Sequence, residues 1–69
     1  MREVHLEYTK YIVMICAIGH NVWFKDTECT DLEGALNRRL WLLKNCKVNV
    51  EVEERFIKRT IYKFEESEE

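Results

Sequence analysis

The sequence predicts a small α+β domain with the element order β-β-α-β-β, in which one helix packs on one face of an antiparallel sheet. Three observations predict this fold. Strand-like segments lie near both ends of the chain, a capped amphipathic segment lies between them, and 69 residues suffice for only one domain. We expect one compact domain over residues 1–64, followed by an acidic, disordered tail over residues 65–69.

A long first strand is predicted from about Val4 to Ile18. Val4, Leu6 and Tyr8 alternate with polar residues, which is the period of a strand with one face in water. From Tyr11 onward the segment is apolar on both faces. This change is typical of a strand that becomes central in its sheet or is covered on both sides.

A turn, a short strand and a helix are predicted next. The Gly-His-Asn sequence at residues 19–21 indicates a turn, because Gly and Asn tolerate positive φ, and residues 22–25 then predict a second, antiparallel strand. Thr30 and Glu33 have the spacing of a capping box, in which each side chain bonds the backbone amide of the other residue. The helix is therefore predicted over residues 31–44.

The last part of the chain predicts two further strands. Residues 47–52 alternate cleanly, with three valines on one face. β-Branched and aromatic residues favour another strand within residues 53–65, paired through a turn near its start. Ile57, Ile61 and Phe64 also follow helical spacing, so a helix over residues 53–65 remains the alternative.

A helical wheel separates two faces of the predicted helix. Four leucines fall within one quadrant and are expected to pack on the sheet: Leu32, Leu36, Leu40 and Leu43. Trp41 points to nearly the opposite side, among cations, where it either covers neighbouring aliphatic stems or contacts another protein. Because Trp and Arg contribute most of the binding energy at many interfaces, the predicted partner-binding residues are Arg38, Trp41, Lys44 and Lys47.

Charge is unevenly distributed along the chain, although the net charge is only −2. Residues 34–63 carry eight basic and three acidic side chains, whereas the last six residues include four glutamates. The basic segment suggests a nucleic-acid-binding alternative with phosphate contacts from Arg38, Arg39, Lys58, Arg59 and Lys63. The net acidic charge of the whole chain weighs against that alternative.

Catalytic and metal-binding motifs find little support in the sequence. The single serine, Ser67, lies in the acidic tail, and the sequence contains no Gly-rich phosphate loop. Cys16, His20, Cys29 and Cys46 have ligand chemistry suited to zinc, but their spacing lacks the short C-x2-C pattern that makes such an assignment specific. We therefore expect no enzymatic activity, no cofactor and no metal site.

Compartment and partners follow from the same reasoning. The longest apolar segment has eight residues, against about 20 for a membrane span, and three widely spaced cysteines are not a disulfide framework. A cytoplasmic protein with no membrane association is expected. One helix covers only part of a four-stranded sheet, so a second copy or another protein is expected to cover the rest.

In size and make-up the chain is similar to small phage and mobile-element proteins that bind a larger complex of the host and inhibit or modulate it. The sequence thus favours a small non-enzymatic protein-binding module of that kind. A nucleic-acid-binding accessory protein is the first alternative, and an obligate homodimeric structural protein is the second.

Overall fold

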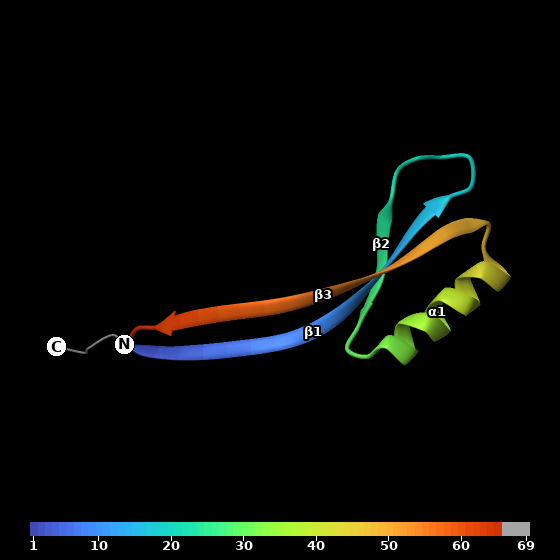
Figure 1. The fold of residues 1–69 in the computed structure, drawn as a ribbon. Coiled ribbons are helices and arrows are strands. Elements are labelled where there is room, and N and C mark those ends of the chain that lie inside the picture. Colours follow the sequence, from blue (N-terminus) through green and yellow to red (C-terminus); the bar gives the residue numbers. More distant parts are fainter. Residues whose placement is uncertain (66–69) are drawn as a thin grey trace.

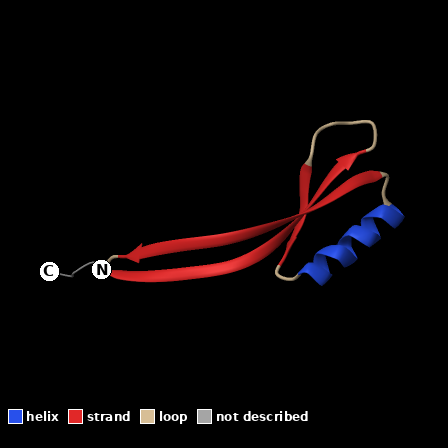
Figure 2. Cartoon of the chain, in the orientation of Figure 1, coloured by secondary structure: helices blue, strands red, loops and turns tan. Residues whose placement is uncertain are grey.

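The computed structural model of this chain describes residues 1–65 and contains one sheet and one helix (Figures 1 and 2). Its elements are β1 (Arg2–Ala17), β2 (Phe24–Cys29), α1 (Leu32–Asn45) and β3 (Val48–Lys63). The strand order is β2-β1-β3, and both neighbouring pairs are antiparallel. The predicted class, a small α+β domain with an antiparallel sheet, is confirmed.

The predicted β-β-α-β-β order is only partly right, because within residues 1–65 a single strand follows the helix. All sixteen residues of β1 pair with β3 in one unbroken register, from Arg2 opposite Lys63 to Ala17 opposite Val48. The predicted turn near residue 53 is wrong, because β3 continues through this position. The alternative of a helix over residues 53–65 is also wrong, because this segment is a strand up to Lys63. Glu53 is a poor turn former, and β1 offers a hydrogen-bonding partner along the whole length of β3.

The second strand occupies later residues than the sequence predicted. The chain turns after β1 through a hydrogen bond from the His20 amide to the Ala17 carbonyl, with Gly19 at a φ of +90°. Residues 18–23 then connect the strands, and β2 pairs with the second half of β1 only, between Tyr11 and Ile15. The predicted strand at residues 22–25 is thus displaced towards the helix.

Helix α1 is capped by Asp31 and not by the predicted Thr30. The Asp31 carboxylate accepts a 2.6 Å hydrogen bond from the Gly34 amide, and Glu33 follows in the first turn, where a negative charge suits the helix dipole. A Cβ atom on residue 34 would lie 2.9 Å from Oδ1 of Asp31. Glycine at this position therefore leaves space for the cap.

The face of α1 that packs on the sheet differs from the predicted one. Ala35 and Leu42 are 0% and 3% exposed and pack with Val13, whereas the four leucines of the predicted packing face are 41–55% exposed. The small Ala35 side chain lets the helix backbone come close to the sheet. The helix is consequently rotated by about a quarter turn from the orientation that its leucines predicted.

The first half of β1 and the second half of β3 extend away from α1 and β2 as a two-stranded arm (Figure 1). We define the arm as residues 2–10 and 55–63. The molecule measures 60 × 23 × 16 Å, and its radius of gyration is 18.0 Å, against about 11 Å for a compact chain of this length. The rest of the domain, with α1, β2 and the inner halves of β1 and β3, contains the core.

The two faces of the arm differ in polarity, because residues opposite each other in an antiparallel pair lie on the same face. One face carries apolar side chains interspersed with an equal number of cations: the apolar ones are Val4, Leu6, Tyr8, Ile57 and Ile61, and the cations are Arg2, Lys10, Arg55, Arg59 and Lys63. The other face is mainly polar and includes Glu3, His5, Glu7, Thr9, Lys58 and Thr60 beside Phe56 and Tyr62. An isolated two-stranded ribbon is only marginally stable in water.

Candidate protein-binding surface

A β-bulge in β2 connects the sheet to the helix. Val13 pairs with Thr27 and Met14 pairs with Lys25, so Asp26 is the extra residue. The Asp26 carboxylate accepts two hydrogen bonds from Arg38 of α1, at 2.7 Å from Nε and 3.1 Å from Nη2. The bulge thus directs Asp26 towards the helix.

This ion pair shifts the pKa values of both Asp26 and Arg38. Hydrogen bonding and charge from Arg38 hold the pKa of Asp26 below its ordinary value, against the opposing effect of desolvation. The hydrogen bond with Asp26 also raises the pKa of Arg38. The Arg38 guanidinium carbon lies 4.6 Å from the centre of the Trp41 ring, within cation–π range. Arg38 is therefore engaged within the chain, where it helps to position Trp41.

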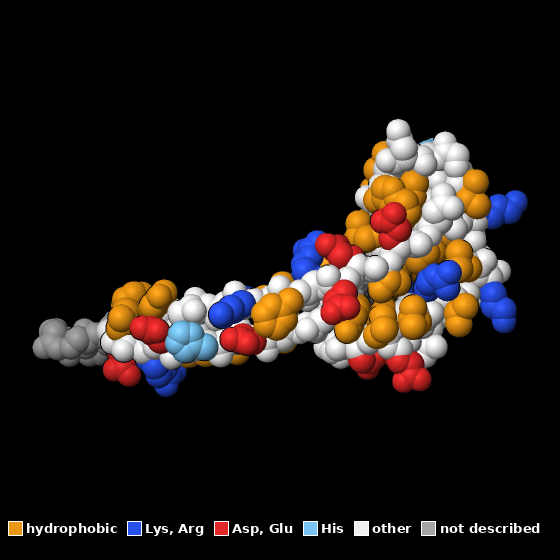
Figure 3. All heavy atoms as spheres, viewed as in Figure 1, with side chains coloured by type: hydrophobic (Ala, Val, Ile, Leu, Met, Phe, Trp, Pro, Cys, Tyr) orange, Lys and Arg blue, Asp and Glu red, His pale blue; other side chains and the backbone are white. Residues whose placement is uncertain are grey.

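The outward side of α1 carries a large apolar surface, which we call the outer helix surface. Figure 3 shows hydrophobic side chains gathered over the helix. Leu40 is 55% exposed, and the members of the surface are Leu32, Leu36, Leu40 and Leu43. Trp41 is 50% exposed but lies about 100° further round the helix than Leu40, beside Arg38. Arg39, Lys44 and Lys47 are exposed around it. The combination of exposed leucines, a tryptophan and cations is typical of a surface that binds another protein.

Three of the four predicted partner-binding residues are exposed to solvent, and the fourth, Arg38, forms an ion pair within the chain. Trp41 and Lys44 lie on the exposed part of the helix, and Lys47 follows the helix just before β3. Arg38 is directed to Asp26 of β2. The leucines were missed as surface residues, although the pairing of small Ala35 with Leu42, seven residues later, was a signal for the true packing face.

The predicted nucleic-acid-binding residues are not brought together in one patch. Arg38 and Arg39 lie on α1, whereas Lys58, Arg59 and Lys63 lie on the arm. Lys58 and Arg59 are consecutive strand residues, so their side chains point to opposite faces of the arm.

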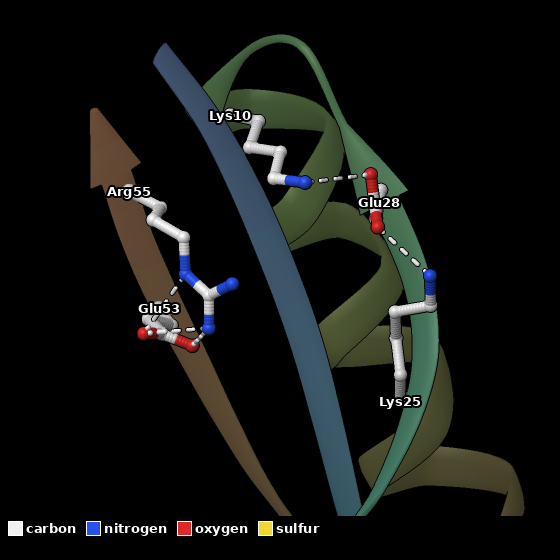
Figure 4. Close-up of polar contacts among 5 residues, drawn as sticks. All are labelled: Lys10, Lys25, Glu28, Glu53 and Arg55. Atoms are coloured by element: carbon white, nitrogen blue, oxygen red, sulfur yellow. Dashed lines mark hydrogen bonds and ion pairs between the residues drawn. The ribbon is translucent and has the colours of Figure 1, made fainter. Parts of the chain in front are cut away.

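Charged side chains cover part of the sheet face that lies opposite α1 (Figure 4). Glu28 forms ion pairs with Lys25 at 2.8 Å and Lys10 at 3.5 Å, and its pKa is lowered first by the hydrogen bond from Lys25 and then by the charges of both lysines. Glu53 pairs with Arg55 at 3.0 Å. Ile12, opposite both glutamates, is only 4% exposed, which indicates that the stems of these long side chains replace a covering element there.

An apolar cavity of about 420 Å³ lies at the end of the sheet next to the 18–23 connection. It is lined by Ile15, Ala17, His20, Val22, Phe24 and Val48. The same connection covers Cys16, whose thiol donates a 3.0 Å hydrogen bond to the His20 carbonyl and which is 2% exposed.

Two further properties concern only the part of the chain that the structure describes. Within residues 1–65, no three His, Cys, Asp or Glu side chains gather where they could hold a metal ion. In the same residues, no helix has the length and apolar character needed to cross a membrane.

In comparisons with known proteins, the chain matches no protein-family model, no curated protein and no solved structure.

Proposed function

We propose that this chain is a small non-enzymatic protein-binding module, and that the outer helix surface binds its partner. The observation that carries the proposal is the exposure of four leucines, at 41–55%, on the only helix of residues 1–65. Leaving this much apolar surface in water is unfavourable, so burial against another protein is favoured. An inhibitor or modulator of a larger host complex is the kind of module that we propose.

The charges around the surface define the chemistry of the partner. Arg39, Lys44 and Lys47 are exposed around the leucines, and Glu33 near the start of the helix is the acidic exception. A protein with an apolar groove flanked by carboxylates would be complementary to this surface in both shape and charge. Rising salt is therefore expected to slow association while leaving the apolar contact in place.

A capture experiment with matched variants tests this proposal. The chain, a Leu40→Asp variant and a control Ile18→Asp variant are immobilised and exposed to extract of the native cell or of its host. Leu40 and Ile18 are 55% and 62% exposed, so both substitutions place a carboxylate at an accessible apolar position, but only the first lies on the outer helix surface. A protein retained by the chain and by Ile18→Asp, but not by Leu40→Asp, is then purified.

Titration with the purified partner gives the decisive measurement. Leu40→Asp is expected to weaken binding at least about tenfold, as for a central residue of an interface, and Trp41→Ala by a smaller factor, because Trp41 lies about 100° round the helix from Leu40. Circular dichroism checks that each variant remains folded. Equal binding by Leu40→Asp and the unmodified chain would exclude the outer helix surface as the site.

A further inference from the structure

We infer that a second copy of this chain pairs with the arm through the edge of β1, which gives a two-fold symmetric dimer with the strand order β3-β1-β1-β3 at its centre. The inference is independent of the outer helix surface, because it uses residues at the other end of the molecule. It rests on three observations: the length of the open edge, the apolar side chains that β1 carries on one face, and the charges that it carries on the other.

The first observation is the extent of the open edge of β1. On the side away from β3, β2 pairs with β1 only between Tyr11 and Ile15. Among the described residues, the same edge is therefore without a strand partner from Arg2 to Lys10. An antiparallel self-pairing that uses this whole segment has its two-fold axis at the central residue, Leu6.

The second observation is the polarity of the side chains that this register brings together. Leu6 would face Leu6 of the second copy, and Val4 would face Tyr8 of the second copy. All three lie on the same face of the arm, and Leu6 and Tyr8 are 38% and 42% exposed in the single chain. The dimer thus places apolar side chains against each other and extends the two-stranded arm to four strands, enough for a stable sheet.

The third observation is the charge pattern on the opposite face. The same register sets His5 of each copy against Glu7 of the other, and Glu3 against Thr9. Shifting the axis to His5 would instead bring Glu3 against Glu7 of the second copy, which is a repulsive pair. At the ends of the preferred register Arg2 faces Lys10, but the carboxylate of Glu28 lies 3.5 Å from Nζ of Lys10 and offsets this contact.

The outer edge of β3 is the competing site for a second copy. A self-pairing centred on Phe56, near the middle of β3, would place Ile57 against Arg55 and Ile61 against Glu51 of the second copy. Ile57 and Ile61 would then face charges on the same side of the sheet, although this register also sets Glu53 against Arg59 and Glu54 against Lys58. In the β1 register, by contrast, Val4, Leu6 and Tyr8 all face apolar side chains of the second copy, which favours the β1 edge.

Complementary single variants test the register directly. His5→Glu sets two carboxylates opposite each other, and Glu7→Lys sets the lysine opposite His5. Each variant alone is expected to weaken dimerisation about tenfold relative to the unmodified chain, since attraction is replaced at two symmetric positions. An equimolar mixture of both variants restores one attractive Glu–Lys pair and one His–Glu pair, so the dimer is expected to return.

Sedimentation equilibrium over a range of protein concentrations provides the readout. The mixture contains the same two chains as the separate samples, so any effect of a substitution within its own chain is present in both measurements. For Glu7 such an effect is expected, because it lies opposite Lys58 of its own β3. A monomeric unmodified chain at all concentrations, or a mixture no more dimeric than its components, would overturn the inference.

Disulfide trapping distinguishes the two strand edges. In a Cys46→Ser background, which removes the exposed native thiol, Leu6→Cys is expected to form a disulfide-linked dimer under mild oxidation, because the two copies of this residue face each other. Val4→Cys is the matched control and is expected to remain unlinked. Crosslinking by Phe56→Cys but not by Leu6→Cys would place the second copy on β3 and contradict the inference.

Discussion

Asp26 shows how a single residue determines the orientation of the helix. As the extra residue of the β2 bulge, it leaves the alternation of the strand and turns towards α1. Its two hydrogen bonds with Arg38 hold the side of the helix that also carries Trp41. A charged pair at this position orients the helix in a way that non-directional apolar packing does not.

Asp26→Asn is expected to lower the thermal stability of the domain at neutral pH, because it keeps the shape of the side chain and removes its charge. The pKa of Asp26 is lowered in the folded state, so its contribution to stability is complete above the ordinary aspartate value of about 3.9 and is lost as the pH falls through the lower folded-state pKa. The difference in Tm between the two proteins should therefore shrink below about pH 4.

Thermal melts recorded by circular dichroism between about pH 2 and pH 7 test this pH dependence. Glu54→Gln, at an exposed position on β3, serves as the control for loss of one carboxylate. A Tm difference that persisted unchanged at the lowest pH would show that the charge of Asp26 is not the source of its effect.

At the level of the element, α1 is amphipathic in a direction that its largest side chains do not reveal. The buried contact comes from Ala35 and Leu42, and the four leucines on the neighbouring face stay exposed. A small residue at the closest approach of helix and sheet lets Leu42 reach the valines of β3. The helix therefore has two apolar faces, one that packs on the core of its own chain and one that is exposed, to which we propose a partner binds.

Leu42→Ala and Leu40→Ala are expected to differ strongly in their effect on stability. Leu42 is 3% exposed, so truncation leaves a cavity and should lower the free energy of unfolding by about 2–3 kcal/mol. Leu40 is 55% exposed, and its truncation should change that free energy by no more than about 0.5 kcal/mol. Urea denaturation at a fixed protein concentration measures both values. Similar losses for the two variants would contradict the observed orientation of the helix.

At the level of the whole molecule, the compact part and the arm have different requirements. Helix α1 covers the inner halves of β1 and β3, whereas the arm extends beyond it (Figure 1). Leu6 and Tyr8 on the arm are exposed. We therefore propose two separate contact regions, the outer helix surface for a partner protein and the β1 edge for a second copy.

The extended shape can be measured in solution on a chain that cannot dimerise through the arm. For Leu6→Glu, small-angle X-ray scattering is expected to give a radius of gyration near the 18.0 Å of the single chain and far from the roughly 11 Å of a compact one. Unmodified protein under dimerising conditions should give a larger value, because the two compact parts then lie at opposite ends. A value near 11 Å for the variant would show that the arm folds back on the domain.

The sequence by itself determined the class of the fold, the long first strand and the existence of the helix. These features depend on local periodicity, such as the alternation of Val4, Leu6 and Tyr8, and on cap chemistry within one or two residues of Asp31. It also indicated Trp41 and Lys44 as exposed helix residues. The proposed binding roles of these residues remain predictions.

Only the tertiary structure decided which face of the helix is buried, where Arg38 points and whether one or two strands follow the helix. Each of these depends on contacts between distant segments: Ala35 against the sheet, Asp26 at the bulge, and sixteen residues of β1 beside β3. Helical periodicity identifies apolar side chains but cannot choose between two neighbouring apolar faces. That choice depends on how closely the backbones approach, and at Ala35 a small side chain permits the close contact.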